Sequence, residues 1–246
     1  MAEDIVLWDK SWEPFFAEES EKLEKIFSFL NAESGRAENG MFLPAYFPDK
    51  NNIFRFTAIR PDRIKGVIVG MEPYASYTIK NRTAIPEATG RSFEVASVDS
   101  WHQKFKQSSL RNFLKAIFCE VENDSEASLE VIRNELQGGY VDIPSPHEWF
   151  NIMEGRGIMF LNAALTVKPG VTGSHMALWQ DFSRDLAGYM AVKSPDACWM
   201  LFGKDAQNLY EPILMEHGRS NIVKTCHPRL PGFVKERPFR KIRRII

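Results

Sequence analysis

The sequence has little of what would cross-link the chain or place it in a membrane. Its three cysteines, Cys119, Cys198 and Cys226, lie far apart, which predicts neither a disulfide framework nor a zinc knuckle. No apolar run approaches the roughly 20 residues that a membrane-spanning helix needs. The acidic start also lacks the basic-then-apolar layout of a signal peptide. We therefore expect an intracellular protein, cytoplasmic or nuclear, with reduced thiols and without metal or cofactor.

The sequence also lacks an excess of charge of one sign. The formal net charge is −1, which excludes a simple polycation that coats nucleic acid. The charges are unevenly spread, because residues 217–246 hold nine lysines and arginines against the single acid Glu236. A basic end on a neutral protein predicts one face that meets phosphates, and the alternative is a solvated tail with no partner.

Internal repeats and Gly/Ser-rich linkers are missing as well, so we expect residues 1–246 to form a single domain. Four short apolar runs are typical of buried parallel strands, at 64–70, 157–161, 197–202 and 221–225. Amphipathic helical patterns occupy 11–30, 176–193 and 205–217. Strands that alternate with helices predict an α/β domain with a central four-stranded parallel sheet flanked by helices.

Polar side chains follow the predicted strands at the points where ligands bind in such sheets. Glu72 comes after the first strand, Asn162 ends the second, and His227 follows the fourth. Each has an ordinary structural explanation when taken singly. A carboxylate, a carboxamide and an imidazole at successive strand ends together predict a functional site.

The same segments are similar to motifs of one enzyme family. Residues 70–74 read Gly-Met-Glu-Pro-Tyr, where the family has Gly-Gln-Asp-Pro-Tyr. Residues 160–167 are similar to its Leu-Leu-Asn-x-x-Leu-Thr-Val strand, and His227-Pro228 to the start of its His-Pro-Ser-Pro-Leu loop. Weaker matches lie in the expected order at 92–95, 107–112, 174–182 and 201–207. The chain therefore resembles the family 1 uracil-DNA glycosylases.

The resemblance implies a monomeric, monofunctional DNA glycosylase that needs no metal, cofactor or membrane. It implies catalytic roles for Glu72 and His227, and contact with the flipped base for Met71, Tyr74, Phe93 and Asn162. It further implies contacts with DNA for Ser108, Ser109, Ser174, His175, Arg229 and Leu230.

The chemistry of these residue types agrees with that assignment. An enzyme that attacks a glycosidic bond in DNA has to take the nucleotide out of the stack. An aromatic ring such as Phe93 offers a face for the flipped base, and the carboxamide of Asn162 presents a donor and an acceptor to its edge. As the bond breaks, Glu72 would stabilise the cation-like sugar, and His227 would donate to the departing anionic base.

Departures from the family pattern leave the substrate and the role open. Glu72 stands where the family has Asp, Met71 replaces Gln, Ala75 replaces His, and the stretch 76–90 is longer. A longer loop predicts room for a substituent on C5, so we expect either uracil or a C5-modified pyrimidine such as a hydroxymethylcytosine derivative. Uracil would imply repair, and a bulky base antiviral defence. The alternative is a catalytically weak fold used as a DNA-binding or processivity module.

Overall fold

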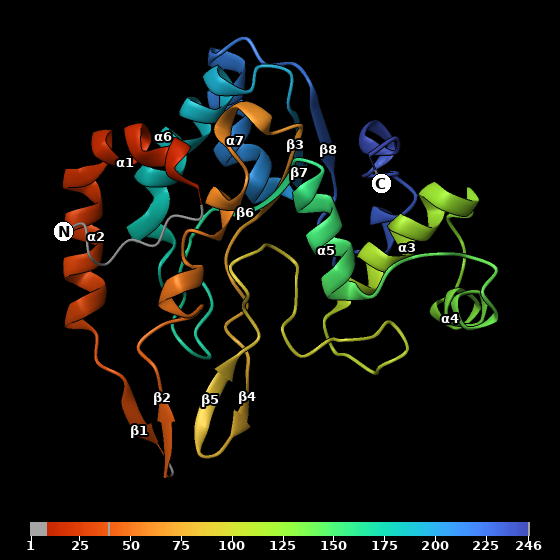
Figure 1. Cartoon of the computed structure of the whole chain (residues 1–246), viewed down its shortest axis with the longest axis horizontal. Helices are drawn as coiled ribbons and strands as arrows, with labels where there is room; N and C mark the ends of the chain where they lie inside the picture. The colour runs from red at the N-terminus through yellow and green to blue at the C-terminus, as the bar shows by residue number, and fades with distance from the viewer. Residues whose placement is uncertain (1–8, 39, 246) are drawn as a thin grey trace.

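A four-stranded parallel sheet forms the centre of the computed structural model, which describes residues 9–38 and 40–245 (Figure 1). The strands are β3 (Gly66–Gly70), β6 (Ile158–Asn162), β7 (Cys198–Phe202) and β8 (Ile222–Thr225), in the order β6-β3-β7-β8. All three pairings are parallel, and Gly70 lies opposite Asn162. The predicted α/β class and its four-stranded parallel sheet are confirmed.

Both faces of this sheet are covered, which explains why its strands are continuous apolar runs. Val67 and Val69 point to one face, into a core shared with α1 (Glu13–Glu18), α2 (Ser20–Ala32), α6 (Met176–Lys193) and α7 (Lys204–Glu216). Ile68 points to the other face, which packs against α3 (Ser108–Glu122), α4 (Leu129–Gly138) and α5 (Pro146–Gly155). The carboxyl ends of all four strands therefore meet at one edge between two layers of helices.

Two of the three predicted helices have nearly the expected bounds, and α3, α4 and α5 were not predicted. α6 has the predicted bounds, and α7 begins one residue earlier than expected. The predicted helix at 11–30 is wrong as a single element. It is a 3-10 turn (Lys10–Trp12) followed by α1 and α2, and the chain bends at Glu19. The bend lets the aromatic residues before it and the aliphatic residues after it reach the same core. Among the described residues, no helix is both long and apolar enough to cross a membrane.

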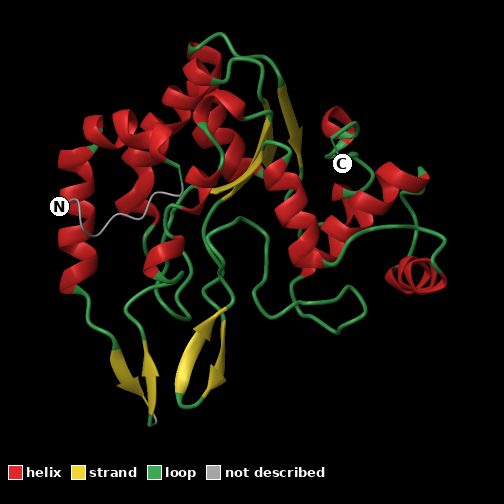
Figure 2. Cartoon of the chain, in the orientation of Figure 1, coloured by secondary structure: helices red, strands yellow, loops and turns green. Residues whose placement is uncertain are grey.

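A second sheet, which the sequence did not predict, projects beyond the main body (Figures 1 and 2). It consists of β1 (Arg36–Glu38), β2 (Met41–Leu43), β4 (Tyr77–Lys80) and β5 (Thr83–Pro86), in the order β1-β2-β5-β4. We call it the hairpin sheet. Its β4–β5 hairpin is the stretch 76–90 that is longer than the family pattern. A small apolar cluster fixes its root, comprising Leu43, Phe47, Ala75, Ala84, Ala88 and Val167.

Candidate active site

Asn162 and Phe93 approach each other across Gly70, at the carboxyl end of the central strand. A Cβ atom at position 70 would lie 2.6 Å from Asn162 Oδ1, 2.8 Å from Ser92 Cβ and 3.6 Å from the Phe93 ring. Only glycine leaves room for that arrangement. Asn162 is 3% exposed. A carboxamide and an aromatic ring thus lie side by side at the predicted place.

The stacking residue is held in a strained backbone conformation. Phe93 has φ +66°, a region that residues with side chains seldom adopt. Ser92 anchors the segment to the sheet, since its hydroxyl donates to Ile68 O at 3.0 Å and its N–H to Phe160 O at 3.3 Å. The Phe93 ring stacks on Phe113 of α3, with ring centroids 4.7 Å apart and planes 28° apart. Strain of this kind is typical of functional sites.

A network of buried charges lies behind Phe93. The Arg91 guanidinium donates to Glu94, Glu154 and Asn151, and Glu154 also accepts from Arg55. His147 Nδ1 lies 3.0 Å from Glu94 Oε1. Burial raises the pKa of Glu94, but its hydrogen bond with His147 and the charge of Arg91 hold that pKa below its ordinary value. The sequence analysis missed this network, whose only local signal is an arginine and a glutamate flanking Phe93.

Glu72 lies opposite, on the loop that leaves β3. Its Oε2 accepts a hydrogen bond of 2.6 Å from the N–H of Gly173, in the loop before α6. The carboxylate is half-buried, and burial raises its pKa, although the Gly173 N–H opposes the shift. It also borders a cavity of about 600 Å³ between α6 and α7. A carboxylate that is partly desolvated and still open to solvent is suited to holding a water molecule.

Met71 and Tyr74 adjoin Glu72 on the same loop. Met71 is partly buried and packs against the core on the α6 side of the sheet. The Tyr74 hydroxyl is buried and has no hydrogen-bond partner among the described residues. Burial raises the pKa of Tyr74, and the nearby carboxylate of Glu87 raises it further. Glu87 itself is fixed by Ser97, whose N–H and hydroxyl donate to it at 3.1 and 2.9 Å. Tyr74 therefore lies near Glu87, at the root of the hairpin sheet.

His227 is oriented by its own loop. The N–H of Arg229 donates to His227 Nδ1 at 3.1 Å. In the neutral ring the hydrogen is then on Nε2, which is left as a donor. Burial lowers the pKa of His227, Arg229 lowers it further, and Asp205 opposes them. The imidazole is thus neutral near pH 7.

Helix α3 brings four of the predicted DNA-contacting residues together. Ser108 and Ser109 are its first two residues and are partly exposed. One turn further, the Asn112 side chain donates to Pro228 O at 2.6 Å, which fixes the loop between His227 and Leu230. Arg229 and Leu230 are exposed on that loop, Leu230 to 49%. The role of Asn112 was not predicted, although it lies within a segment similar to the family motif.

His175 and Ser174 are less exposed than Arg229 and Leu230. The His175 side chain is fully buried, with Nδ1 2.8 Å from Thr166 Oγ1 and Nε2 3.1 Å from Glu33 Oε2. Burial lowers the pKa of His175, and Glu33 opposes the shift. Ser174 Oγ accepts from Lys168 N at 2.8 Å and is partly exposed. The His175 ring therefore supports the loop that holds Glu72, and its geometry gives no support to a direct contact with DNA.

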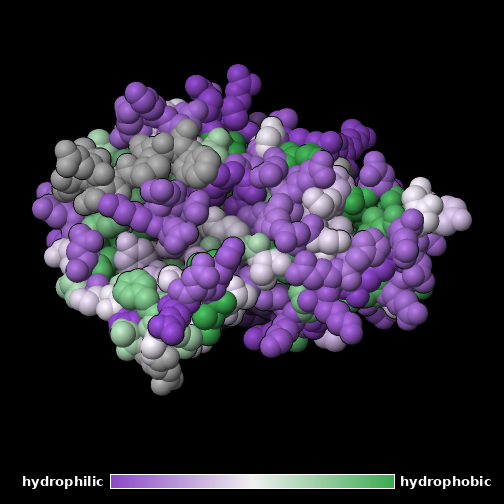
Figure 3. All heavy atoms as spheres, turned by 60° about the horizontal axis from the view of Figure 1, so that its bottom comes forward, coloured by the Kyte–Doolittle hydropathy of each residue, from purple (hydrophilic) through white to green (hydrophobic). Residues whose placement is uncertain are grey.

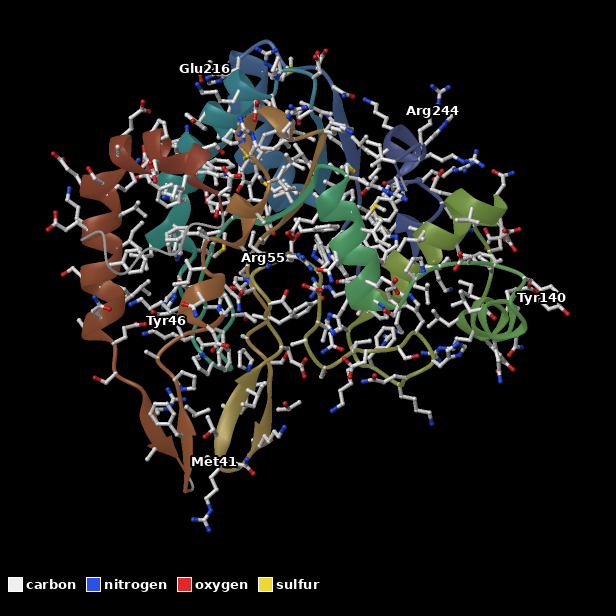
Figure 4. All side chains as sticks on the ribbon, in the orientation of Figure 1. Met41, Tyr46, Arg55, Tyr140, Glu216 and Arg244 are labelled. Atoms are coloured by element: carbon white, nitrogen blue, oxygen red, sulfur yellow. The ribbon has the colours of Figure 1, made fainter. Side chains whose placement is uncertain are left out.

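The basic C-terminal stretch is less available to phosphates than its sequence indicated. Arg237 binds Glu120 and Asn123 of the α3 region, and Lys235 pairs with Glu126. Lys224 pairs with Glu211. Arg229 remains exposed beside His227. Arg244 is also exposed, and it lies far from the hairpin sheet (Figure 4). Several of these cations thus tie the end of the chain to the protein.

Similarity to known proteins agrees with this geometry. No family model matches the chain. Uracil-DNA glycosylase of Francisella tularensis subsp. holarctica is 26% identical over 223 residues, 89% of this chain and 83% of the relative. Uracil-DNA glycosylase of Tropheryma whipplei is 27% identical over 229 residues, 89% of this chain and 84% of the relative. The chain is therefore similar to uracil-DNA glycosylases along most of its length.

Solved structures show that the superfamily fold extends over nearly the whole chain. The wild-type UNG of Nitratifractor salsuginis has a TM-score of 0.71 at 21% identity, covering 96% of this chain and 91% of that one. Mimivirus uracil-DNA glycosylase has a TM-score of 0.66 at 21% identity, covering 90% of this chain and 69% of that one. The resemblance drawn from the motifs is confirmed, and the roles of single residues within the superfamily site stay predictions.

Proposed function

We propose that this protein is a monofunctional DNA glycosylase, acting as a monomer. It flips a pyrimidine out of DNA and hydrolyses its N-glycosidic bond to leave an abasic site. The observation that carries the proposal is the meeting of Asn162 and Phe93 across Gly70, at the edge of the sheet where Glu72 follows β3 and His227 follows β8. These four groups are what recognition and release of a flipped base require.

In this proposal the base enters between the two sides of the pocket. Stacking on Phe93 is worth about 1–3 kcal/mol, which offsets part of the cost of unstacking. The Asn162 carboxamide pairs with the edge of the ring. As the glycosidic bond lengthens, ionised Glu72 stabilises the positive charge on the sugar and holds the attacking water. The Nε2–H of His227 stabilises the negative charge that develops on the base.

The substrate is uracil or a pyrimidine modified at C5. The names of the relatives support uracil, and hence base-excision repair. Met71, Ala75 and the hairpin between Tyr74 and Phe93 support a modified base, and hence antiviral defence. Glu87, at the root of this hairpin, is the part of the hairpin near Tyr74. We therefore propose that Tyr74 and the root of the hairpin distinguish pyrimidines by their substituent at C5.

A binding or processivity module is the alternative. It is favoured by the residue at position 72, where a glutamate replaces the family's aspartate and places the carboxylate one methylene further from the backbone. The oriented imidazole of His227 supports catalysis instead, because a pure scaffold has no use for a donor aimed at a base.

The test is excision from DNA duplexes that contain uracil, thymine, cytosine, hydroxymethylcytosine or a glycosylated hydroxymethylcytosine at one position. Abasic sites are detected by alkaline strand cleavage, and binding to the same duplexes is measured in parallel. We expect cleavage of one substrate and a loss of about 100–1000-fold in His227→Ala. Tight binding without an abasic product from any duplex would establish the binding module instead.

A further inference from the structure

The hairpin sheet is rigidly placed next to the base pocket. Tyr77, which begins β4, is the third residue after Tyr74, and β5 ends seven residues before Phe93. The hairpin is thus inserted between Tyr74 and Phe93, two residues that the proposed function places around the base. Gly170 N–H donates to Ala75 O at 2.8 Å and Glu87 N–H to Ser76 O at 3.1 Å, so backbone bonds fix its root. From there it projects past the body of the molecule (Figure 1).

The turn at its tip contains an arginine in a conformation that suits glycine. Asn81 has φ +51° and Arg82 has φ +60°, as in a type I′ hairpin turn, for which Asn-Gly is the favoured pair. The fold uses only the backbone of Arg82, whose carbonyl accepts from Phe42 N–H at 2.8 Å. Its side chain is exposed, and no ion pair is recorded for it within residues 9–38 and 40–245. A strained cation with no role in packing indicates a function outside the fold.

The surface around Arg82 combines positive charge with apolar atoms. Lys80 is exposed beside the turn, and Phe42, Ile79 and Ile85 are 51%, 55% and 41% exposed. Phe42 pairs in register with Thr83, and its half-exposed ring lies against Gly35. In Figure 3 one of several hydrophobic patches lies at the lower left of a mostly hydrophilic face.

We propose that the hairpin sheet is an accessory DNA clamp, in which Arg82 and Lys80 bind phosphates of DNA flanking the flipped nucleotide. The clamp rests on the proposed function, because it needs DNA at the neighbouring pocket. Four strand residues at about 3.3 Å each span about 13 Å, or about four base-pair rises of 3.4 Å. The tip therefore reaches phosphates a few nucleotides away, while the apolar side chains cover sugar edges. Phosphate contacts carry no base identity, so the clamp adds affinity and leaves base preference to the pocket.

The decisive variant is Arg82→Gly, which removes the cation and relieves the backbone strain. It should keep or raise the melting temperature while weakening binding to DNA. Each lost phosphate contact lowers the slope of log K against log salt by about 0.9, which is about fivefold in affinity at 0.15 M salt. Lys80→Ala should lower the slope by a similar amount. Affinity is measured by fluorescence anisotropy on duplex DNA without a target base, over a range of salt concentrations.

The matched control is Arg244→Ala, which removes an exposed arginine far from the hairpin sheet (Figure 4). It should leave the salt slope unchanged. An unchanged slope in both Arg82→Gly and Lys80→Ala would overturn the clamp, as would an equal loss in the control. Because the duplex has no target base, the result does not depend on excision. A protein that excises no base but loses affinity in these variants would overturn the proposed function and keep the clamp.

Discussion

The two sides of the proposed base pocket are built in different ways. On one side Phe93 is fixed by Ser92, by stacking on Phe113 and by the buried charges around Arg91. On the other side the Glu72 carboxylate accepts one hydrogen bond from the described part of the chain, from the Gly173 N–H, and burial raises its pKa. Phe93 is thus fixed by several contacts. Glu72 has fewer contacts, and the main effect of its surroundings is on the pKa of its carboxyl group.

This difference separates stability from chemistry. A ring that stacks on a base needs a fixed position, and paired buried charges supply it at the expense of tolerance to substitution. A carboxylate that stabilises a cation needs ionisation and access to water, which a dense network of partners would restrict. Substitutions around Phe93 should therefore lower stability, whereas substitutions of Glu72 should lower the rate of excision and leave stability unchanged.

The largest effect on folding is expected from Arg91→Gln. It leaves Glu94 and Glu154 without their shared cation in a buried setting, so the free energy of unfolding should fall by about 3–5 kcal/mol. Urea denaturation measures the change. The control is Arg60→Gln, which breaks the exposed pair with Asp62 and should have no measurable effect. Equal losses of unfolding free energy in Arg91→Gln and Arg60→Gln would show that the buried charges do not stabilise the region around Phe93.

Glu72→Gln should show the reverse signature. Excision should fall by about 100–1000-fold, because the neutral carboxamide no longer stabilises the cation-like sugar. The melting temperature should stay the same or rise, since the carboxamide still accepts from Gly173 and no charge is buried. Single-turnover excision and thermal denaturation measure the two quantities. Full activity in this variant would remove Glu72 from the mechanism.

The pH dependence of excision should follow Glu72. Its pKa is raised, so excision should fall as the pH drops, with a midpoint above 4.5, and by about tenfold per unit below it. The pKa of His227 is lowered from 6.5, which extends the range of the neutral imidazole to lower pH. The residual activity of Glu72→Gln should lack this acidic limb. If the fall in excision at low pH persists unchanged in Glu72→Gln, another group is responsible for it.

The smallest effect concerns His147 on the stacking side. Its hydrogen bond with Glu94 raises the pKa of His147 above 6.5. The stability that this pair contributes is therefore fully present below pH 6.5 and is lost as the pH rises through the raised pKa. His147→Gln should remove that decline in denaturation curves recorded from pH 6 to 9. Excision at pH 6 should change little, and a large loss there would show that His147 acts in the chemistry.

The sequence revealed those parts of the fold in which local pattern and burial agree. The four strands of the main sheet are continuous apolar runs because both faces are buried, and α6 has one apolar stripe. The hairpin sheet escaped prediction because its strands are only three or four residues long and half-exposed.

Within the site, Glu72, Asn162 and His227 were found because the ends of parallel strands share an edge. The contacts that hold the site were not, since Arg91, near Phe93, meets Glu154 across 63 positions and Glu72 meets Gly173 across 101. Sequence position also gave no sign that the His175 ring is buried. Tertiary contacts over such separations follow from packing, which local patterns do not encode.

Helix α3 supports two parts of the pocket from adjacent residues. Asn112 fixes the loop that holds His227, and Phe113 carries the ring on which Phe93 stacks. A displacement of α3 would therefore disturb the imidazole and the Phe93 ring together, although Ser92 also ties Phe93 to β3. Glu72 does not share the support of this helix, because it is held by β3 and by the loop before α6. A substitution in α3 thus reaches two of the proposed functional groups at once and leaves the third in place.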